Sequence, residues 1–341
     1  MRKPHPPQRR RSPKPAARLR EPSRARKAQA LKGSDFLSLA DIDRAQFLAI
    51  LATAAKVKAD IRPFRQALSG MAAVLLFEKP SLRTRLTFEV GFRALGGDVV
   101  MMDHSANPLG ERESVKDYAR TIERCVDCVV ARVFKQSVLE EMAGVVGIPI
   151  VNALSELHHP CQGLADLLTL REHCGDFSSL KFAYIGDGNN VCHSLMHGAA
   201  LAGAKLVVIT PPGNAPLARI VEESRRIAKN SNAEIELTED PAKVAGCKAV
   251  YTDVWISMGQ GAGRADEAGK RRKLFMPYQV TPELMARAGS DAKFLHCLPA
   301  HRGTEVLDSV IDSPNSVVFD QAENRMHAQN ALLLHLLTDM K

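Results

Sequence analysis

The sequence contains no apolar run of the ~18–20 residues that a membrane-spanning helix needs, and no charged-then-apolar signal peptide opens the chain. Its seven cysteines are an odd number without the spacing of a disulfide framework, which favours reduced thiols. Cys125 and Cys128 form a CxxC, but valines surround them and no second ligand pair accompanies them, so we interpret the pair as part of a buried strand. We therefore expect a soluble, cytoplasmic protein.

Acidic residues are almost absent from the N-terminal segment. Residues 1–32 hold 12 Lys or Arg, six prolines and one acid, Glu21, so the rest of the chain carries a net charge of −3 although the whole carries +8. With few bulky apolar side chains the segment cannot offset the entropy of ordering, and we expect a disordered basic tail. A weak nucleic-acid or membrane-surface contact and a transit peptide are the alternatives, but prolines oppose the helix of a transit peptide. No nucleic-acid or membrane partner is expected.

Short, β-branched-rich apolar runs alternate with helical patterns along the rest of the chain. The runs cover residues 72–77, 98–102, 128–134, 147–151, 181–187, 204–210, 248–253, 292–297 and 317–319. Such strands, separated by helices, are typical of parallel sheets covered on both faces. For 341 residues this predicts an α/β protein of two domains, each a mostly parallel sheet flanked by helices, with the functional site in the cleft between them.

The expected domains follow from the positions of the helices. Leucines line one side of a predicted helix over 159–174, which ends at a Cys-Gly stop signal and is expected to connect the two sheets. The first domain would then span 33–158 and the second 175–320. A last amphipathic helix within 321–341 is expected to return to the first domain.

Polar residues that directly follow the predicted strands are the candidates for a ligand site, because open parallel sheets bind ligands beyond the carboxyl ends of their strands. The first half offers mainly cations and amides: Glu78, Lys79, Ser81, Arg83, Thr84, Arg85, Arg132, Asn152, His158, His159 and Gln162. The second half offers acids, amides and a thiol: Asp187, Asn189, Asn190, Asp253, Ser257, Met258, His296 and Cys297.

Residues 77–97 run from a strand through Pro80 into a helix. Ser81 is the natural N-cap of that helix, whose free N–H groups and dipole create an anion site. Arg83 and Arg85 add charge that suits a phosphate. An ordinary capped helix with solvated arginines is the alternative.

Six segments, in the same order along the chain, resemble motifs of the aspartate/ornithine carbamoyltransferase family and agree with its ornithine branch. They are SLRTR (81–85), HPCQGLAD (159–166), GDGNN (186–190), DVWISMG (253–259), HCLPAHRG (296–303) and ENRMHAQ (323–329). The resemblance covers about residues 35–341. It implies transfer of the carbamoyl group of carbamoyl phosphate to the δ-amine of L-ornithine, which gives L-citrulline and phosphate in arginine biosynthesis. It also implies a homotrimer that needs no metal or other cofactor.

For carbamoyl phosphate, the resemblance implies a clamp. Ser81, Leu82, Arg83 and Thr84 would hold the phosphate with Arg132, while His159, Gln162, Cys297, the carbonyl of Leu298 and Arg325 would surround the carbamoyl group. Such a clamp supplies proximity, and its donors would stabilise the negative charge of a tetrahedral intermediate. A core or capping role is the alternative for His159.

For ornithine, the resemblance implies that Asn190, Asp253, Ser257 and Met258 fix the α-amino and α-carboxylate groups. Asp253 can pair with the ammonium, while Asn190 and the amide of Met258 meet the carboxylate. Cys297 would lie near the δ-amine, either to accept its proton or only to orient it, and a buried apolar thiol is its alternative. The implied catalytic residues are thus Cys297, Arg83, His159 and Asp253.

Some alternatives stay open. Many ornithine enzymes carry glutamine before the LG of a loop that reaches a neighbouring subunit, whereas this chain has Asn107 and Pro108 there. If the trimer forms, Ser114 and Lys116 would lie near that interface. GDGNN lacks the third glycine of G-x-G-x-x-G, which disfavours a nicotinamide cofactor. The competing amines are aspartate, putrescine and an acylated ornithine, and the DVWISMG segment favours free ornithine over them. A non-catalytic regulatory or nucleic-acid-binding relative is the other hypothesis, which the presence of every phosphate and amino-acid motif disfavours.

Overall fold

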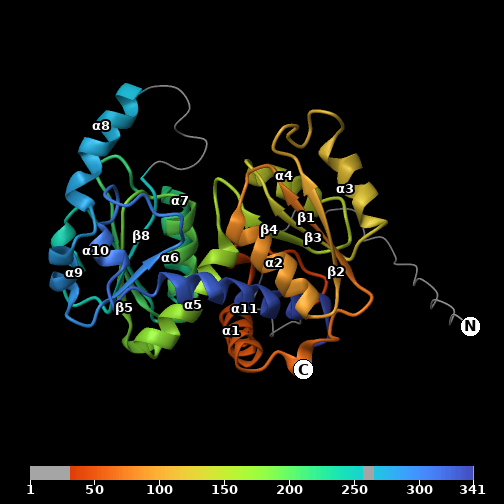
Figure 1. Cartoon of the computed structure of the whole chain (residues 1–341), viewed down its shortest axis with the longest axis horizontal. Coiled ribbons are helices and arrows are strands. Elements are labelled where there is room, and N and C mark those ends of the chain that lie inside the picture. The colour runs from red at the N-terminus through yellow and green to blue at the C-terminus, as the bar shows by residue number, and fades with distance from the viewer. Residues whose placement is uncertain (1–30, 256–264, 341) are drawn as a thin grey trace, which may run out of the picture.

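The computed structural model describes residues 31–255 and 265–340, which fold into two lobes side by side (Figure 1). The first lobe holds a four-stranded sheet in the order β2-β1-β3-β4 and the second a five-stranded sheet in the order β7-β6-β5-β8-β9. Every pairing in both sheets is parallel. The predicted tail lies outside the described residues except for Leu31 and Lys32, and so do Ser257 and Met258.

The strands are β1 (Ala72–Phe77), β2 (Asp98–Asp103), β3 (Cys128–Arg132), β4 (Ile150–Leu154), β5 (Lys181–Ile185), β6 (Lys205–Ile209), β7 (Glu234–Thr238), β8 (Ala249–Thr252) and β9 (Lys293–His296). The helices are α1 (Arg44–Ala59), α2 (Leu82–Ala94), α3 (Val115–Glu123), α4 (Gln136–Ala143), α5 (Pro160–Cys174), α6 (Asn190–Ala202), α7 (Ala218–Ala228), α8 (Ala265–Phe275), α9 (Pro282–Ala288), α10 (Asp308–Ile311) and α11 (Val318–Leu337). The predicted α/β class with two helix-flanked parallel sheets is confirmed.

The position of each strand in its sheet follows from its composition. The central strands β1 and β3 are almost entirely buried, because helices cover both faces of the sheet and leave only apolar side chains compatible with those positions. The edge strands β2 and β7 alternate between exposed and partly buried residues. Both lobes therefore have apolar interiors on either side of their sheets.

Two sequence-based strand assignments need correction. The run at 317–319 is no strand: Val317 is the N-cap of α11 and Val318 its first residue. Its valines are apolar because they pack into the cores beside the second sheet, whereas Phe319 is 69% exposed. Strand β7 was not predicted, because its sequence EIELT alternates charged and apolar residues, as a solvent-facing helix also can.

Helices α5 and α11 join the lobes. Residues 160–170 of α5 are buried on every side, because both lobes pack against this helix. Helix α11 packs along α5, α1 and α2, which carries the C-terminus back to the first lobe (Figure 1).

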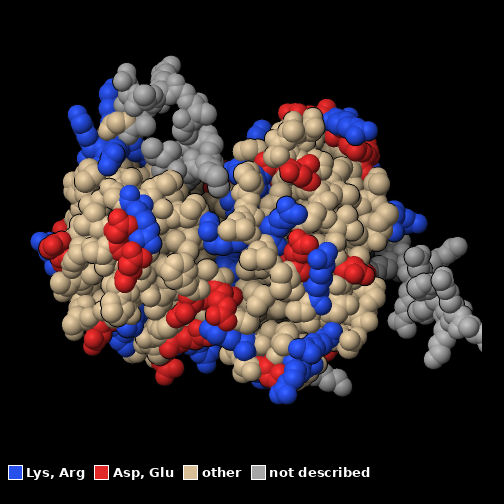
Figure 2. All heavy atoms as spheres, in the orientation of Figure 1, with Lys and Arg blue, Asp and Glu red and all other residues tan. Residues whose placement is uncertain are grey.

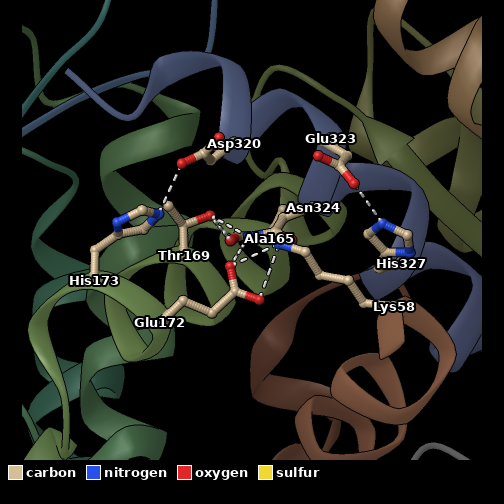
Figure 3. Close-up of polar contacts among 9 residues, drawn as sticks. All are labelled: Lys58, Ala165, Thr169, Glu172, His173, Asp320, Glu323, Asn324 and His327. Carbon is tan, nitrogen blue, oxygen red and sulfur yellow. Dashed lines mark hydrogen bonds and ion pairs between the residues drawn. The ribbon is translucent and has the colours of Figure 1, made fainter. Parts of the chain in front are cut away.

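A cluster of polar side chains connects helices α1, α5 and α11 (Figure 3). The Lys58 ammonium of α1 lies 2.9 Å from Glu172 Oε2 of α5 and 2.9 Å from Asn324 Oδ1 of α11, and Asn324 Nδ2 donates to Glu172 Oε2 at 2.7 Å. His173 of α5 pairs with Asp320 of α11 at 2.9 Å. These contacts set the position of α11 along α5. In the described ranges, no helix combines the length and apolar character that crossing a membrane requires.

Candidate active site

The N-terminus of α2 lies at the carboxyl end of β1 and faces the furrow between the lobes, where Lys and Arg side chains gather (Figure 2). Ser81 caps the helix, because its Oγ accepts the N–H of Thr84 at 3.3 Å. Leu82 and Arg83 begin the first turn, so their N–H groups have no intrahelical partner. The side chain of Leu82 is 74% exposed, so this residue would contribute its backbone N–H to an anion site.

Cationic side chains from different elements converge beside this helix end. The Thr84 hydroxyl accepts from Arg325 Nη2 of α11 at 3.0 Å and from Arg132 Nη1 of β3 at 3.4 Å. Arg325 Nη1 also donates to Gln162 Oε1 of α5 at 2.7 Å. Burial lowers the pKa of Arg132 to about 10, and repulsion from Arg325 and Arg83 adds to the shift.

The electrostatics of this cluster favour an anionic ligand. Arg132 and Arg325 are both buried, and Arg132 Nε has no hydrogen-bond partner among the described residues. Because burying unpaired cations is costly, an anion that neutralises them would stabilise the arrangement. The geometry therefore supports the anion site that the sequence predicted.

His159 closes the other side of the cluster as the N-cap residue of α5. Its imidazole is 4% exposed and its Nδ1 has no partner among the described residues. Desolvation, followed by the charges of Arg325 and Arg132, holds the pKa of His159 well below its usual value. The ring is therefore neutral and keeps one N–H donor and one acceptor nitrogen. Its backbone N–H donates to Ser194 Oγ of α6 at 2.8 Å, which ties the site to the second lobe.

A buried polar chain extends from Gln162 to β9. Asp166 Oδ1 accepts from Gln162 Nε2 at 2.8 Å and from Gln321 Nε2 at 2.7 Å, and Gln321 Oε1 accepts the N–H of His296 at 2.9 Å. Burial raises the pKa of Asp166 to about 7, with the two amides opposing the shift. Neither Asp166 nor Gln321 was predicted as a site residue. Asp166 lies in the HPCQGLAD segment, one helical turn after Gln162, and that spacing could have identified it.

On the second lobe, Asp253 and Cys297 follow neighbouring strands and meet. Cys297 Sγ donates to Asp253 Oδ1 at 3.0 Å, and Asn189 Nδ2 donates to Asp253 Oδ2 at 2.8 Å. Desolvation and the adjacent Asp253 carboxylate hold the pKa of Cys297 well above its usual range. The thiol therefore keeps its proton, and of the two options left open by the sequence, the orienting role fits this protonation state better.

Asn190 and Leu298 lie at the edge of this arrangement. Asn190 Nδ2 donates to the carbonyl of Ser155 at 2.6 Å, so the amide that contacts Asp253 is that of Asn189 and not that of Asn190. Leu298 adopts a φ of 56°, a left-handed conformation that branched side chains rarely take, and its N–H donates to His296 Nδ1 at 2.8 Å. Such strained positions cluster at functional sites.

Two family models match the chain. The carbamoyl-P binding domain of aspartate/ornithine carbamoyltransferase matches residues 34–172, and the Asp/Orn binding domain matches residues 178–336. The ornithine carbamoyltransferase of Shewanella oneidensis is 46% identical over 303 residues, which are 89% of this chain and 99% of that protein. The chain belongs to the aspartate/ornithine carbamoyltransferase family.

Other relatives agree with this assignment. The ornithine carbamoyltransferase of Pyrococcus horikoshii is 45% identical over 92% of this chain and 98% of its own length. The solved ornithine carbamoyltransferase from Pyrococcus furiosus superposes with a TM-score of 0.87 at 43% identity, covering 92% of this chain and all of that one. An acetylornithine transcarbamylase complexed with acetylcitrulline has a TM-score of 0.81 at 28% identity, covering 90% and 100%.

In this carbamoyltransferase, one group of described residues has the geometry for a metal ion. Possible ligand atoms of Asp253, His296 and Cys297 lie within 4.8 Å of one another. His296 uses both ring nitrogens already, since Nδ1 accepts from the N–H of Leu298 and Nε2 lies 3.3 Å from Glu305 Oε1. A metal at this position would have to displace one of those contacts of His296 and also the hydrogen bond from Cys297 to Asp253.

Proposed function

We propose that this carbamoyltransferase transfers the carbamoyl group of carbamoyl phosphate to the δ-amine of L-ornithine, giving L-citrulline and phosphate. The observation that carries the proposal is the convergence of Arg132 and Arg325 on the Thr84 hydroxyl, beside the capped N-terminus of α2. Buried guanidinium groups at a helix N-terminus suit a doubly charged phosphate group. The similarity to relatives named ornithine carbamoyltransferase supports ornithine as the amine.

We assign the phosphate of carbamoyl phosphate to the first lobe and its carbamoyl group to the boundary with the second lobe. Ser81, Leu82, Arg83, Thr84 and Arg132 would hold its phosphate, and His159, Gln162, Cys297, Leu298 and Arg325 would surround its carbamoyl group. Neutral His159 can donate to the carbamoyl oxygen, and Arg325 can stabilise the negative charge that this oxygen gains when the amine attacks. As the tetrahedral intermediate collapses, the bond from carbon to the phosphate oxygen breaks, and the departing phosphate takes up the proton that the attacking amine loses. The required catalysis is therefore mainly clamping and charge stabilisation.

We assign ornithine to the second lobe. Asp253 would pair with the α-ammonium, and Asn190 would meet the α-carboxylate together with Ser257 and Met258, which lie outside the described residues. Cys297 would orient the δ-amine, because its proton is retained. For Asn190 to bind the carboxylate, its Nδ2 would exchange the carbonyl of Ser155 for the substrate.

A panel of amines tests the substrate assignment. With carbamoyl phosphate present, we expect kcat/KM for L-ornithine to exceed that for acetylornithine, putrescine and aspartate by about 100-fold or more, the scale on which unpaired buried polar groups discriminate. Putrescine lacks the carboxylate, and acylation removes the ammonium that Asp253 would pair with. Released phosphate and the ureido product are measured together. A preference for acetylornithine or putrescine would contradict the assignment to ornithine and leave the carbamoyl-phosphate site intact.

We further propose a cytoplasmic homotrimer. All seven cysteines are free, which suits a reducing compartment. Three apolar residues of α2 at four-residue spacing form an exposed stripe on that helix: Leu82, Leu86 and Val90 are exposed by 74%, 56% and 46%. The buried face is formed instead by Thr84, Thr87, Phe88, Gly91 and Phe92. An apolar stripe of this kind is typical of an interface.

The variant Leu86→Glu tests the interface. Because a charge would be buried against a neighbouring subunit, we expect light scattering to show a trimer for the wild type and smaller species for the variant. Leu217→Glu serves as the control. Leu217 is the N-cap residue of α7 and is 47% exposed, and this variant should remain trimeric. A wild-type monomer, or a trimeric Leu86→Glu protein, would contradict this interface.

A further inference from the structure

Arg271 of α8 connects three separate parts of the second lobe. Its Nη2 lies 2.8 Å from Asp187 Oδ2, its Nη1 donates to Asn214 Oδ1 at 2.8 Å, and its Nε donates to the carbonyl of Trp255 at 2.5 Å. A planar guanidinium can satisfy three acceptors at once, which a lysine ammonium on a flexible stem does less well. No motif in the sequence pointed to this residue.

The three acceptors belong to loops that follow neighbouring strands. Asp187 follows β5, Asn214 follows β6 and Trp255 follows β8, and these strands are adjacent in the order β6-β5-β8. The first two loops also touch directly. The N–H of Gly188 donates to the carbonyl of Asn214 at 2.9 Å, and a Cβ on Gly188 would come within 2.2 Å of the backbone nitrogen of Pro216.

Two of the loops held by Arg271, those after β5 and β8, carry the proposed amino-acid site. Asp253 lies two residues before Trp255. Asn189 lies two residues after Asp187, donates its N–H to the carbonyl of Asp187 at 2.7 Å and donates its Nδ2 to Asp253 Oδ2 at 2.8 Å. Asn190 is the next residue. A movement of Asp187 or Trp255 would therefore displace the groups proposed to bind the two α-substituents of the substrate.

The surroundings of Arg271 hold its guanidinium in place. The group lies over the ring of Phe275, 4.5 Å from the centroid, and Phe275 packs against Trp255 with the centroids 5.6 Å apart. The side chains of Arg271 and Asp187 are 28% and 13% exposed, so water screens this ion pair less than a pair on the open surface. Burial raises the pKa of Asp187, and Arg271 opposes the shift.

We propose that Arg271 is a positioning residue for the amino-acid substrate, because it fixes the placement of the loops that carry Asn190 and Asp253 relative to each other. It touches neither of these side chains and acts through Asp187 and Trp255. The inference rests on the proposed function of the second lobe as the ornithine site. It gives a specific consequence: loss of the guanidinium weakens recognition of the amino acid and leaves recognition of carbamoyl phosphate unchanged.

Kinetics of Arg271→Met and Arg271→Lys test the inference. In Arg271→Met we expect KM for ornithine to rise about tenfold or more, as the loss of several charged hydrogen bonds implies, with a smaller change in kcat and none in KM for carbamoyl phosphate. Norvaline is ornithine without its δ-amine, and its inhibition constant should rise in proportion to KM for ornithine. Arg271→Lys should fall between the wild type and Arg271→Met, because it keeps the charge opposite Asp187. Arg272→Met, at the exposed neighbouring residue of the same helix, is the matched control and should behave as the wild type.

The outcomes separate the inference from the proposed function. A wild-type protein that does not carbamoylate ornithine would contradict the proposed function itself. If the wild type is active, an unchanged KM for ornithine in Arg271→Met would overturn the positioning role. Equal losses for both substrates, with a lowered melting temperature in Arg271→Met and Arg271→Lys alike, would also overturn it and assign Arg271 to general stability.

Discussion

Replacing Arg83 with alanine is expected to lower kcat/KM for carbamoyl phosphate by about 10²–10³-fold, the cost of removing one preorganised donor from a site of developing charge. Arg83 is the second residue of α2, and its side chain makes no hydrogen bond or ion pair with another described residue. Desolvation lowers its pKa, as expected for a guanidinium held at a partly enclosed site for an anion. The expected loss is therefore one of transition-state stabilisation, and the fold should be retained.

Arg85→Ala is the matched control for this prediction. Arg85 lies on the same helix, its side chain is 62% exposed, and it lies 3.7 Å from Glu89 across the helix surface. Exposed pairs of this kind contribute little, so we expect phosphate release and the melting temperature to stay close to the wild-type values. Turnover of Arg83→Ala at the wild-type rate, or an equal loss in both variants, would contradict the clamp.

The strands show how far composition alone can predict the fold. The buried strand β3 was predicted because a strand covered on both faces is continuously apolar, and residues 128–132 consist almost wholly of such side chains. Strand β7 was not predicted because it lies at the edge of its sheet, where exposed positions carry charged residues that interrupt the apolar run. Residues 317–319 were assigned wrongly, since a buried helix N-terminus can be as apolar as a strand.

Most residues of the candidate site could be predicted from sequence motifs, but their hydrogen-bond partners could not. Asn189 and Asn190 are adjacent amides in one segment, and only the orientation of α6 decides that Asn189 contacts Asp253 while Asn190 contacts Ser155. The same limit applies to Asp166 and Gln321, which meet although 155 positions separate them in the chain. Tertiary packing determines such pairs, and a single sequence does not display it.

The protonation of Cys297 also depends on packing. A cysteine at a strand end near cations could be a thiolate, which would accept a proton from the amine. In the structure, desolvation and the Asp253 carboxylate both disfavour the thiolate, and these effects exceed the attraction of Arg83 and Arg132.

Replacing Asp253 with asparagine is expected to lower kcat/KM for ornithine by about 10²–10³-fold, because a neutral amide cannot pair with the α-ammonium at a position where the residue is only 5% exposed. Asparagine has nearly the same shape and can still accept from Asn189, so the strand ends should keep their positions. KM for carbamoyl phosphate should change only a few-fold, since the cationic cluster on the first lobe is untouched.

The measurement is steady-state kinetics with each substrate varied in turn, supported by a melting curve. Cys297→Ala serves as the comparison: it removes the donor to Asp253 and retains the carboxylate. If Asp253 is the partner of the ammonium, Cys297→Ala should keep more activity towards ornithine than Asp253→Asn, with its loss mainly in kcat. The reverse order, in which Cys297→Ala is the more damaged in KM for ornithine, would assign recognition of the amine to the thiol and contradict the role given to Asp253.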